Sequence, residues 1–149
     1  MGSILNDADR TEIRDRIVSV TRASVPRWGR MDAQAMLNHL RLSALMALGE
    51  LPVACKSKRA FQVFPIKHLI LHVAPFPKGA PTAPELLARC DGANLEVEKQ
   101  ALRANLERLG GVKPGDPLQE HPAFGVLTYK DYGVLMARHT EHHFRQFGL

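Results

Sequence analysis

The residues in this chain best suited to chemistry are histidines near its C-terminal end. His139, His142 and His143 lie close together in the stretch HTEHH. If this stretch is helical, at about 100° per residue, His143 lies about 40° around the axis from His139, and His142 lies about 60° away on the other flank. Two imidazoles one helical turn apart can both reach one divalent ion, so His139 and His143 are candidate metal ligands.

A third ligand has to come from another part of the chain, and His39 is the strongest candidate. It lies at the edge of an apolar helical stripe, beside Met36 and Ser43, where an imidazole without a partner would be costly to bury. Three histidines leave one coordination position free for water or a substrate, which is typical of catalytic zinc-like sites. The spacing leaves alternatives open. His39 could be a hydrogen-bonded core residue, and the C-terminal histidines could form a solvated helix end.

Two further groups of residues carry weaker signals. His68 and His72 form a rival pair one helical turn apart, and we favour an interpretation in which backbone carbonyls satisfy them and they hold no metal. Cys55, followed by Lys56 and Lys58, could have a lowered thiol pKa and act as a nucleophile. No Cys-His or Ser-His-Asp arrangement accompanies it, so a structural or incidental thiol is expected.

Composition narrows the classes of protein to which the chain can belong. Its 149 residues, 45% hydrophobic and 23% charged, predict a single globular domain over residues 1–149. The net charge of +5 is scattered, and the densest basic stretch, 56–59, lacks interleaved aromatic residues, so we expect no specific nucleic-acid partner. No apolar run approaches the ~20 residues needed to cross a bilayer, so no membrane association is expected. Only Cys55 and Cys90 could form a disulfide, and no secretory leader is evident, which predicts a cytoplasmic protein.

The elements that must position the histidines are predicted to be helices, because apolar residues recur with helical periodicity and no strand pattern is present. The first helix should start at Asn6 or Asp7 and end at Ser24–Pro26. The predicted second, fourth and fifth helices cover 32–48, 94–109 and 128–149, and a third helical pattern over 58–73 contains Pro65, which either kinks it or marks its first turn. Two long loops join these helices. The chain is therefore predicted to be all-α, a four-helix bundle with a crossover connection and short extra helices.

Four segments resemble a known family. They are the stretch from Trp28 to Leu40 (WGRMDAQAMLNHL), 75–82 (PFPKGAPT), 121–125 (HPAFG) and 139–147 (HTEHHFRQF). In this order and at these separations they look like the DinB-like superfamily, and more narrowly its branch known as a domain of unknown function. The resemblance covers nearly the whole chain. It departs at Tyr132, where this branch more often has tryptophan, a difference that concerns packing of the last helix.

The resemblance implies a metal site and a fold. DinB-like proteins are four-helix bundles with a crossover, often dimeric, that hold a divalent metal through one histidine of the second helix and a His-X-X-X-His pair of the last. Carried onto this chain, the ligands are His39, His139 and His143. His142 would lie around the ligands or face outward, and Gln146 would line or support the site.

The resemblance also implies a function. Characterised relatives include thiol transferases and a thiol-dependent isomerase that use bacillithiol, mycothiol or glutathione. We therefore expect a metal-dependent enzyme, with nickel or zinc, that activates a low-molecular-weight thiol for transfer to an electrophilic small molecule. Water in place of the thiol would make the site hydrolytic. A non-catalytic bundle that binds a metal or small ligand is the alternative, a DNA-binding role ranks third, and a homodimer is expected.

Overall fold

A computed structural model of the chain describes residues 2–54, 59–87 and 94–149. Over these residues the protein is all-α, as predicted, with an isolated bridge between His121 and Gly125 and no β-strand. The elements are, in chain order, α1 (Asp7–Ser19), α2 (Ala33–Ala47), the 3-10 turn η1 (Arg59–Gln62), α3 (Ile66–His72), the 3-10 turn η2 (Pro84–Leu87), α4 (Leu95–Gly110) and α5 (Tyr129–Phe147).

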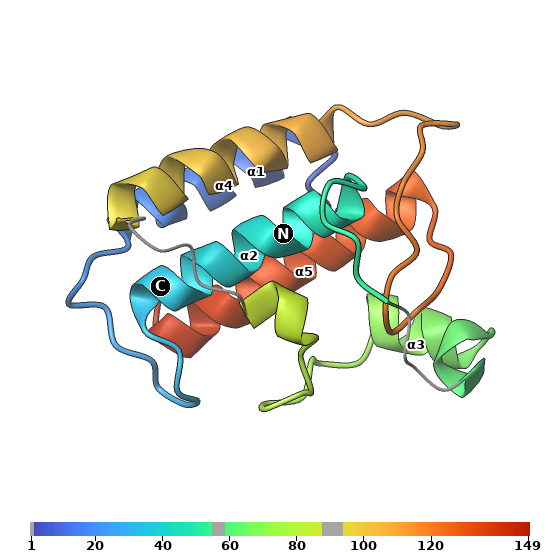
Figure 1. Cartoon of the computed structure of the whole chain (residues 1–149), viewed down its shortest axis with the longest axis horizontal. Coiled ribbons are helices and arrows are strands. Elements are labelled where there is room, and N and C mark those ends of the chain that lie inside the picture. The colour runs from blue at the N-terminus through green and yellow to red at the C-terminus, as the bar shows by residue number, and fades with distance from the viewer. Residues whose placement is uncertain (1, 55–58, 88–93) are drawn as a thin grey trace.

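The four long helices pack into one body. Figure 1 shows α1 behind α4 along one side of the molecule and α2 beside α5 along the other. Helix α2 contacts both α4 and α5, and α1 also contacts both of them. The short helix α3 packs against α5, and η2 packs against α2. The consequence for the site is that α2 and α5, which carry the candidate histidines, face each other directly.

Side-chain caps fix where the helices begin. The Asn6 side chain accepts hydrogen bonds from the backbone N–H groups of the first turn of α1, and Asp32 does the same for α2. Thr128 and Asp131 form a reciprocal capping box at the start of α5. These starts agree with the predicted ones, because short polar side chains before an apolar periodic run satisfy the otherwise unpaired N–H groups of a helix.

Two boundaries differ from those expected. Helix α1 ends at Ser19 and not near Ser24, because Val20 adopts an extended backbone (ψ 131°) that turns its side chain fully into the core. The helical pattern over 58–73 is divided into η1 and α3, and Pro65 immediately precedes α3, as one of the two interpretations of that proline had it. Residue 58 lies outside the described residues.

Apolar side chains from all four long helices form one core. Its fully buried members include Ile13, Ile17, Met36, Leu37, Leu40, Leu102, Leu106, Leu109 and Phe144. Tyr132 is also buried, and its hydroxyl donates to the Gln119 carbonyl over 2.6 Å. Between α2 and α4, the Arg41 guanidinium pairs with the buried Glu98 carboxylate at 2.7 Å.

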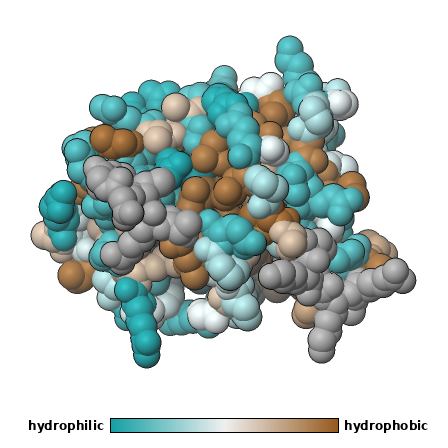
Figure 2. All heavy atoms as spheres, in the orientation of Figure 1, coloured by the Kyte–Doolittle hydropathy of each residue, from teal (hydrophilic) through white to brown (hydrophobic). Residues whose placement is uncertain are grey.

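The outer surface is mixed in character. In the orientation of Figure 2, hydrophilic residues cover much of the visible face, and hydrophobic residues gather toward its middle. None of the described helices is both long enough and apolar enough to span a membrane.

Candidate metal centre

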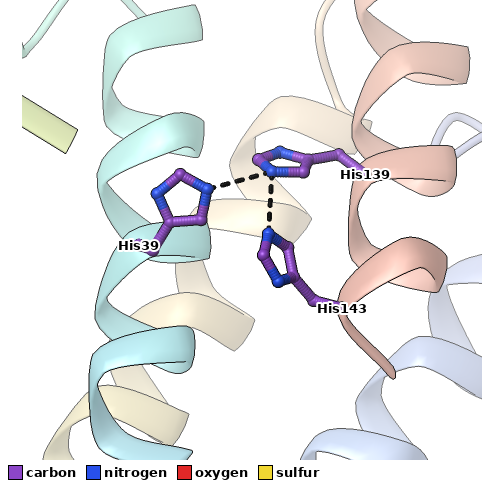
Figure 3. Close-up of side chains that lie close together, drawn as sticks. All are labelled: His39, His139 and His143. Carbon is purple, nitrogen blue, oxygen red and sulfur yellow. Dashed lines mark hydrogen bonds between the residues drawn. The ribbon is translucent and has the colours of Figure 1, made fainter. Parts of the chain in front are cut away.

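Three histidines from two facing helices converge on one point. His39 projects from α2, and His139 and His143 project from successive turns of α5 (Figure 3). The Nε2 atom of His139 lies 3.0 Å from Nε2 of His39 and 3.1 Å from Nε2 of His143. Among the described residues, this is the one group of three or more histidine, cysteine or acidic side chains whose ligand atoms all lie within 4.8 Å of one another. The structure thus brings together the three residues predicted as ligands.

The positions of these side chains follow from local sequence. His39 lies in the middle of α2, where its neighbours Leu37 and Leu40 are fully buried, so the packing of α2 orients the imidazole toward α5. On α5, the capping box fixes the start of the helix, and the spacing of four residues stacks His143 one turn below His139. The packing of the apolar stripes of α2 and α5 therefore sets the separation of the two helices, and with it the distance from His39 to the two histidines of α5.

A hydrogen bond at the nitrogen of His39 that faces away from the other two histidines, its outer nitrogen, determines the tautomer of the ring. His39 Nδ1 lies 3.0 Å from the Leu86 carbonyl oxygen, which belongs to η2. Because a carbonyl can only accept, Nδ1 carries the hydrogen and Nε2 keeps a lone pair that faces the other two imidazoles. Residues far from α2 in sequence thus prepare this ring as a ligand.

Two linked hydrogen bonds determine the tautomer of His143. Its Nδ1 lies 2.8 Å from Oε1 of Gln146, and the Gln146 amide nitrogen donates to the Trp28 carbonyl over 2.8 Å. Since the Trp28 carbonyl can only accept, the amide orientation is fixed, Oε1 faces His143, and Nδ1 must donate to it. The Nε2 lone pair of His143 is consequently directed at the centre of the triad.

Burial keeps these imidazoles neutral. His39 is 4% exposed and His143 is 7% exposed. Burial lowers the pKa of His39 and lowers the pKa of His143 to about 3, with a smaller effect from His39 on His143. Burial has the largest effect on His139 and, together with a smaller effect of the neighbouring histidines, holds its pKa well below the ordinary value. At neutral pH all three rings can therefore act as electron-pair donors.

This arrangement fits a metal ion better than it fits the imidazoles alone. The Nε2 lone pairs of His39 and His143 both face Nε2 of His139, which can carry at most one hydrogen to share between them. A divalent cation at the centre would accept all three lone pairs, and each outer hydrogen bond would orient its ligand as in known histidine metal sites. The donor set is thus suited to a metal.

His142 lies beside the triad and not in it. The residue is half-buried, and its ring centroid is 5.9 Å from that of Trp28 and 6.1 Å from that of Phe76. Phe76 also lies 6.4 Å from the ring of His139. We refer to Trp28, Phe76 and His142 together as the aromatic rim. The position of His142 agrees with the prediction that it would lie around the ligands. Trp28 and Phe76 belong to the family motifs, but the sequence did not predict them as site residues.

The proline-rich segment that carries Phe76 is tied to α5. The Arg138 guanidinium donates to the backbone carbonyls of Ile70, Leu71 and Ala74, and it lies 5.2 Å from the Phe76 ring. Arg138 directly precedes His139. Arg138 of α5 therefore holds the segment that places Phe76 beside His139. Sequence periodicity could not reveal this contact.

A further histidine near the site had no role in the sequence-based prediction. His121 accepts hydrogen bonds at Nδ1 from the backbone N–H groups of Ala123 (3.1 Å) and Phe124 (3.3 Å). Burial lowers its pKa to about 4, and it contributes to the lowered pKa of His139. The only sequence signal was its membership of the HPAFG motif.

The remaining candidates lie apart from the centre. His68 and His72 are exposed, with ring centroids 4.5 Å apart, and neither belongs to the cluster of candidate ligands. The partner of His72 is the carboxylate of Asp131, at 3.5 Å, and not a backbone carbonyl as expected, because α3 packs against the first turn of α5. Cys55, Cys90 and the basic stretch at 56–58 lie outside the described residues.

Comparisons with protein-family models, with curated proteins and with solved structures found no match to this chain.

Proposed function

We propose that this protein is a metal-dependent enzyme of the DinB-like type that transfers a low-molecular-weight thiol, of the bacillithiol, mycothiol or glutathione class, to an electrophilic small molecule. The observation that supports the proposal is the convergence of three neutral imidazoles, of which His39 and His143 already have their outer nitrogens engaged in hydrogen bonds. A purely structural zinc site generally has four protein ligands, whereas three leave a position for a substrate.

His39, His139 and His143 would hold the metal, which we propose to be nickel or zinc, since imidazole suits both. When bound, a divalent cation favours the thiolate form of a thiol ligand, whose pKa is otherwise about 8.5. The surrounding protein groups would then orient the ligands. The Leu86 carbonyl and Gln146 hold two of the imidazoles in the ligating tautomer.

The rest of the site would govern what reaches the sulfur. Phe76, beside His139, would reduce the access of water and so favour a thiol over hydroxide as the nucleophile. In the transfer, a sulfur lone pair forms the new bond to the electrophilic carbon, the leaving group departs with the former bonding pair, and the thiol proton is released to solvent. Among the described residues, no acidic side chain or cysteine joins the three histidines in the cluster of candidate ligands.

We also propose that α1, α2, α4 and α5 form the four-helix bundle with a crossover that the family resemblance implies. The mutual packing of these helices supports this arrangement. The long connection between α2 and α4 contains α3 and η2, and it would act as the crossover. It supplies both Leu86 and Phe76 to the site, so the connection would also serve the metal centre.

The first test is elemental analysis of the untagged protein beside His39→Ala and His139→Ala variants. We expect about one divalent metal per chain in the parent and loss of the metal in both variants. His68→Ala is the matched control, because His68 is exposed and outside the cluster, and it should keep the metal. A parent that neither contains nor takes up nickel or zinc would refute the metal centre.

The second test concerns the reaction. The metal-loaded parent should consume a free thiol in the presence of a panel of alkylating and epoxide electrophiles, and His139→Ala should lose this activity while its circular dichroism spectrum is retained. A protein that holds the metal but consumes no thiol with any electrophile would instead be a non-catalytic metal- or ligand-binding bundle.

A further inference from the structure

The ammonium group of Lys78 lies at the outer edge of the aromatic rim. Lys78 Nζ lies 4.4 Å above the Trp28 ring, and Trp28 in turn contacts the ring of His142. Lys78 belongs to the same proline-rich segment as Phe76, whose ring contacts both His142 and His139. The rings of Trp28 and Phe76 thus connect the metal centre to the ammonium group.

From this arrangement we infer that Lys78 receives the anionic group of the ligand, so that the thiol bound at the triad is one that carries a carboxylate or similar acid several bonds from its sulfur. The inference rests on the proposed function and narrows its substrate class. The sulfur would take the open position beside the three imidazoles, the middle of the ligand would lie along Trp28 and Phe76, and its acid would meet Lys78.

The charges around the rim favour Lys78 over other cations as the receiving group. Arg145 is already paired with the Glu141 carboxylate at 2.8 Å, and Glu141 also pairs with Arg16 at 2.6 Å. Among the described residues, no carboxylate forms an ion pair with Lys78, and its ammonium group is held by the face of Trp28 alone. An anionic ligand would supply the missing partner.

The surroundings reinforce the positive character of this edge. Arg27 and Arg30 flank Trp28 in sequence, and both are exposed. Exposed cations beside Trp28 in sequence add to the attraction of this edge for an anion.

The test compares acids with neutral analogues of equal length. Cobalt-loaded protein is titrated with ω-mercaptoalkanoates, from 3-mercaptopropionate to 8-mercaptooctanoate, and with the ω-mercaptoalkanols of the same lengths. Binding is followed by the cobalt absorption spectrum and by the fluorescence of Trp28, which is the sole tryptophan and lies in the rim. The longer acids cannot chelate the metal in a small ring, so any preference for them reports recognition of the anion.

We expect the parent protein to bind the longer acids about two- to fivefold more tightly than the alcohols, as one exposed ion pair can provide. Lys78→Gln should lose this preference without weakening the binding of the alcohols, and Lys78→Arg should keep it. Lys130→Gln is the matched control, because Lys130 lies at the start of α5, beside Tyr129 and away from the rim, and should behave as the parent does. Equal affinity for acids and alcohols in the parent, or a preference that survives in Lys78→Gln, would overturn the inference.

A parallel series separates this inference from the proposed function. The ω-(imidazol-1-yl)alkanoates and the corresponding alcohols bind a metal without thiol chemistry. If thiols leave the cobalt spectrum unchanged but the imidazole acids show the Lys78-dependent preference, thiol activation is refuted and anion recognition stands. If thiols bind but neither series shows the preference, the thiol function stands and the role of Lys78 is refuted.

Discussion

Replacement of Gln146 by methionine would test how the protein orients its candidate metal ligands. Methionine has a side chain of similar length and no hydrogen-bonding amide, so Gln146→Met removes two interactions and leaves little empty volume. The lost interactions are the acceptor for Nδ1 of His143, at 2.8 Å, and the donor to the Trp28 carbonyl, also at 2.8 Å.

The expected loss follows from the burial of the His143 ring, which is 7% exposed. Without Gln146, the Nδ1–H group is left buried and unpaired, which costs about 1–3 kcal/mol. The ring can avoid this cost by moving the hydrogen to Nε2, but it then no longer offers a lone pair to the metal. We therefore expect metal affinity to fall about 10- to 100-fold, as is typical when a hydrogen bond that orients a ligand is removed, which corresponds to about 1.4–2.7 kcal/mol.

The assay is a competition titration of zinc against a chromophoric chelator at pH 7.5, with thermal unfolding of the metal-free protein measured in parallel. Thr140→Val is the matched control on the same helix. Thr140 is fully buried, and its hydroxyl has no hydrogen-bond partner among the described residues, so valine should stabilise the fold by about 1 kcal/mol or leave it unchanged. It should not alter zinc affinity. A Gln146→Met variant that is less stable but binds zinc as tightly as the parent would refute the argument that Gln146 selects the ligating tautomer.

Two further perturbations probe the surroundings of the site. Gly29 has a φ of +82°, and a Cβ added there would lie 2.7 Å from Nε2 of Gln146, so Gly29→Ala should weaken zinc binding in the same titration. Gly49→Ala, at φ +77° with no atom within 4 Å, carries a similar backbone strain of about 1 kcal/mol and should lower stability alone. Burial lowers the pKa of His121 to about 4, so between that pH and 6.5 the unfolded chain binds more protons, and the free energy of unfolding of the metal-free protein falls as the pH drops through this window. His121→Asn, which keeps an acceptor for the backbone N–H groups, should remove about 3 kcal/mol of that fall in urea unfolding at pH 4, and an unchanged pH profile would show that His121 is not the titrating group.

The helix starts could be predicted from the sequence because their signals are local. Asn6, Asp32 and Thr128 each precede an apolar periodic run, and each caps its helix as expected. The end of α1 could not be predicted in the same way. Ser19 is not a terminating residue, and the helix ends there because Val20 is drawn into a core built by other helices. Tertiary packing decided that boundary over local propensity.

The residues of the candidate site also fall into two groups, those that local sequence predicts and those that only the tertiary structure reveals. The spacing of His139 and His143 is a property of one helix, so it could be read from the sequence, and His39 could be selected as an imidazole on an apolar stripe. Gln146, which contacts His143, was expected at the site from the family resemblance, but the backbone carbonyls that complete the two sets of hydrogen bonds could not be found. Leu86 and Trp28 act through their oxygen atoms, and no side-chain pattern marks such a role.

These carbonyls suggest how two connections, the one between α1 and α2 and the one between α2 and α4, serve the site. Affinity for the proposed metal would depend on the tautomers of His39 and His143. The Leu86 carbonyl, in 84–87, sets the tautomer of His39, and Gln146 of α5 sets that of His143 while its amide is held by the Trp28 carbonyl in the connection between α1 and α2. The facing helices bring the nitrogen atoms to within reach of one ion, but the connections determine whether those nitrogen atoms offer lone pairs. A redesigned bundle that kept only the three histidines and replaced both connections by short neutral loops should therefore fold and yet bind zinc weakly, with the loss exceeding that of Gln146→Met because both outer hydrogen bonds would be absent.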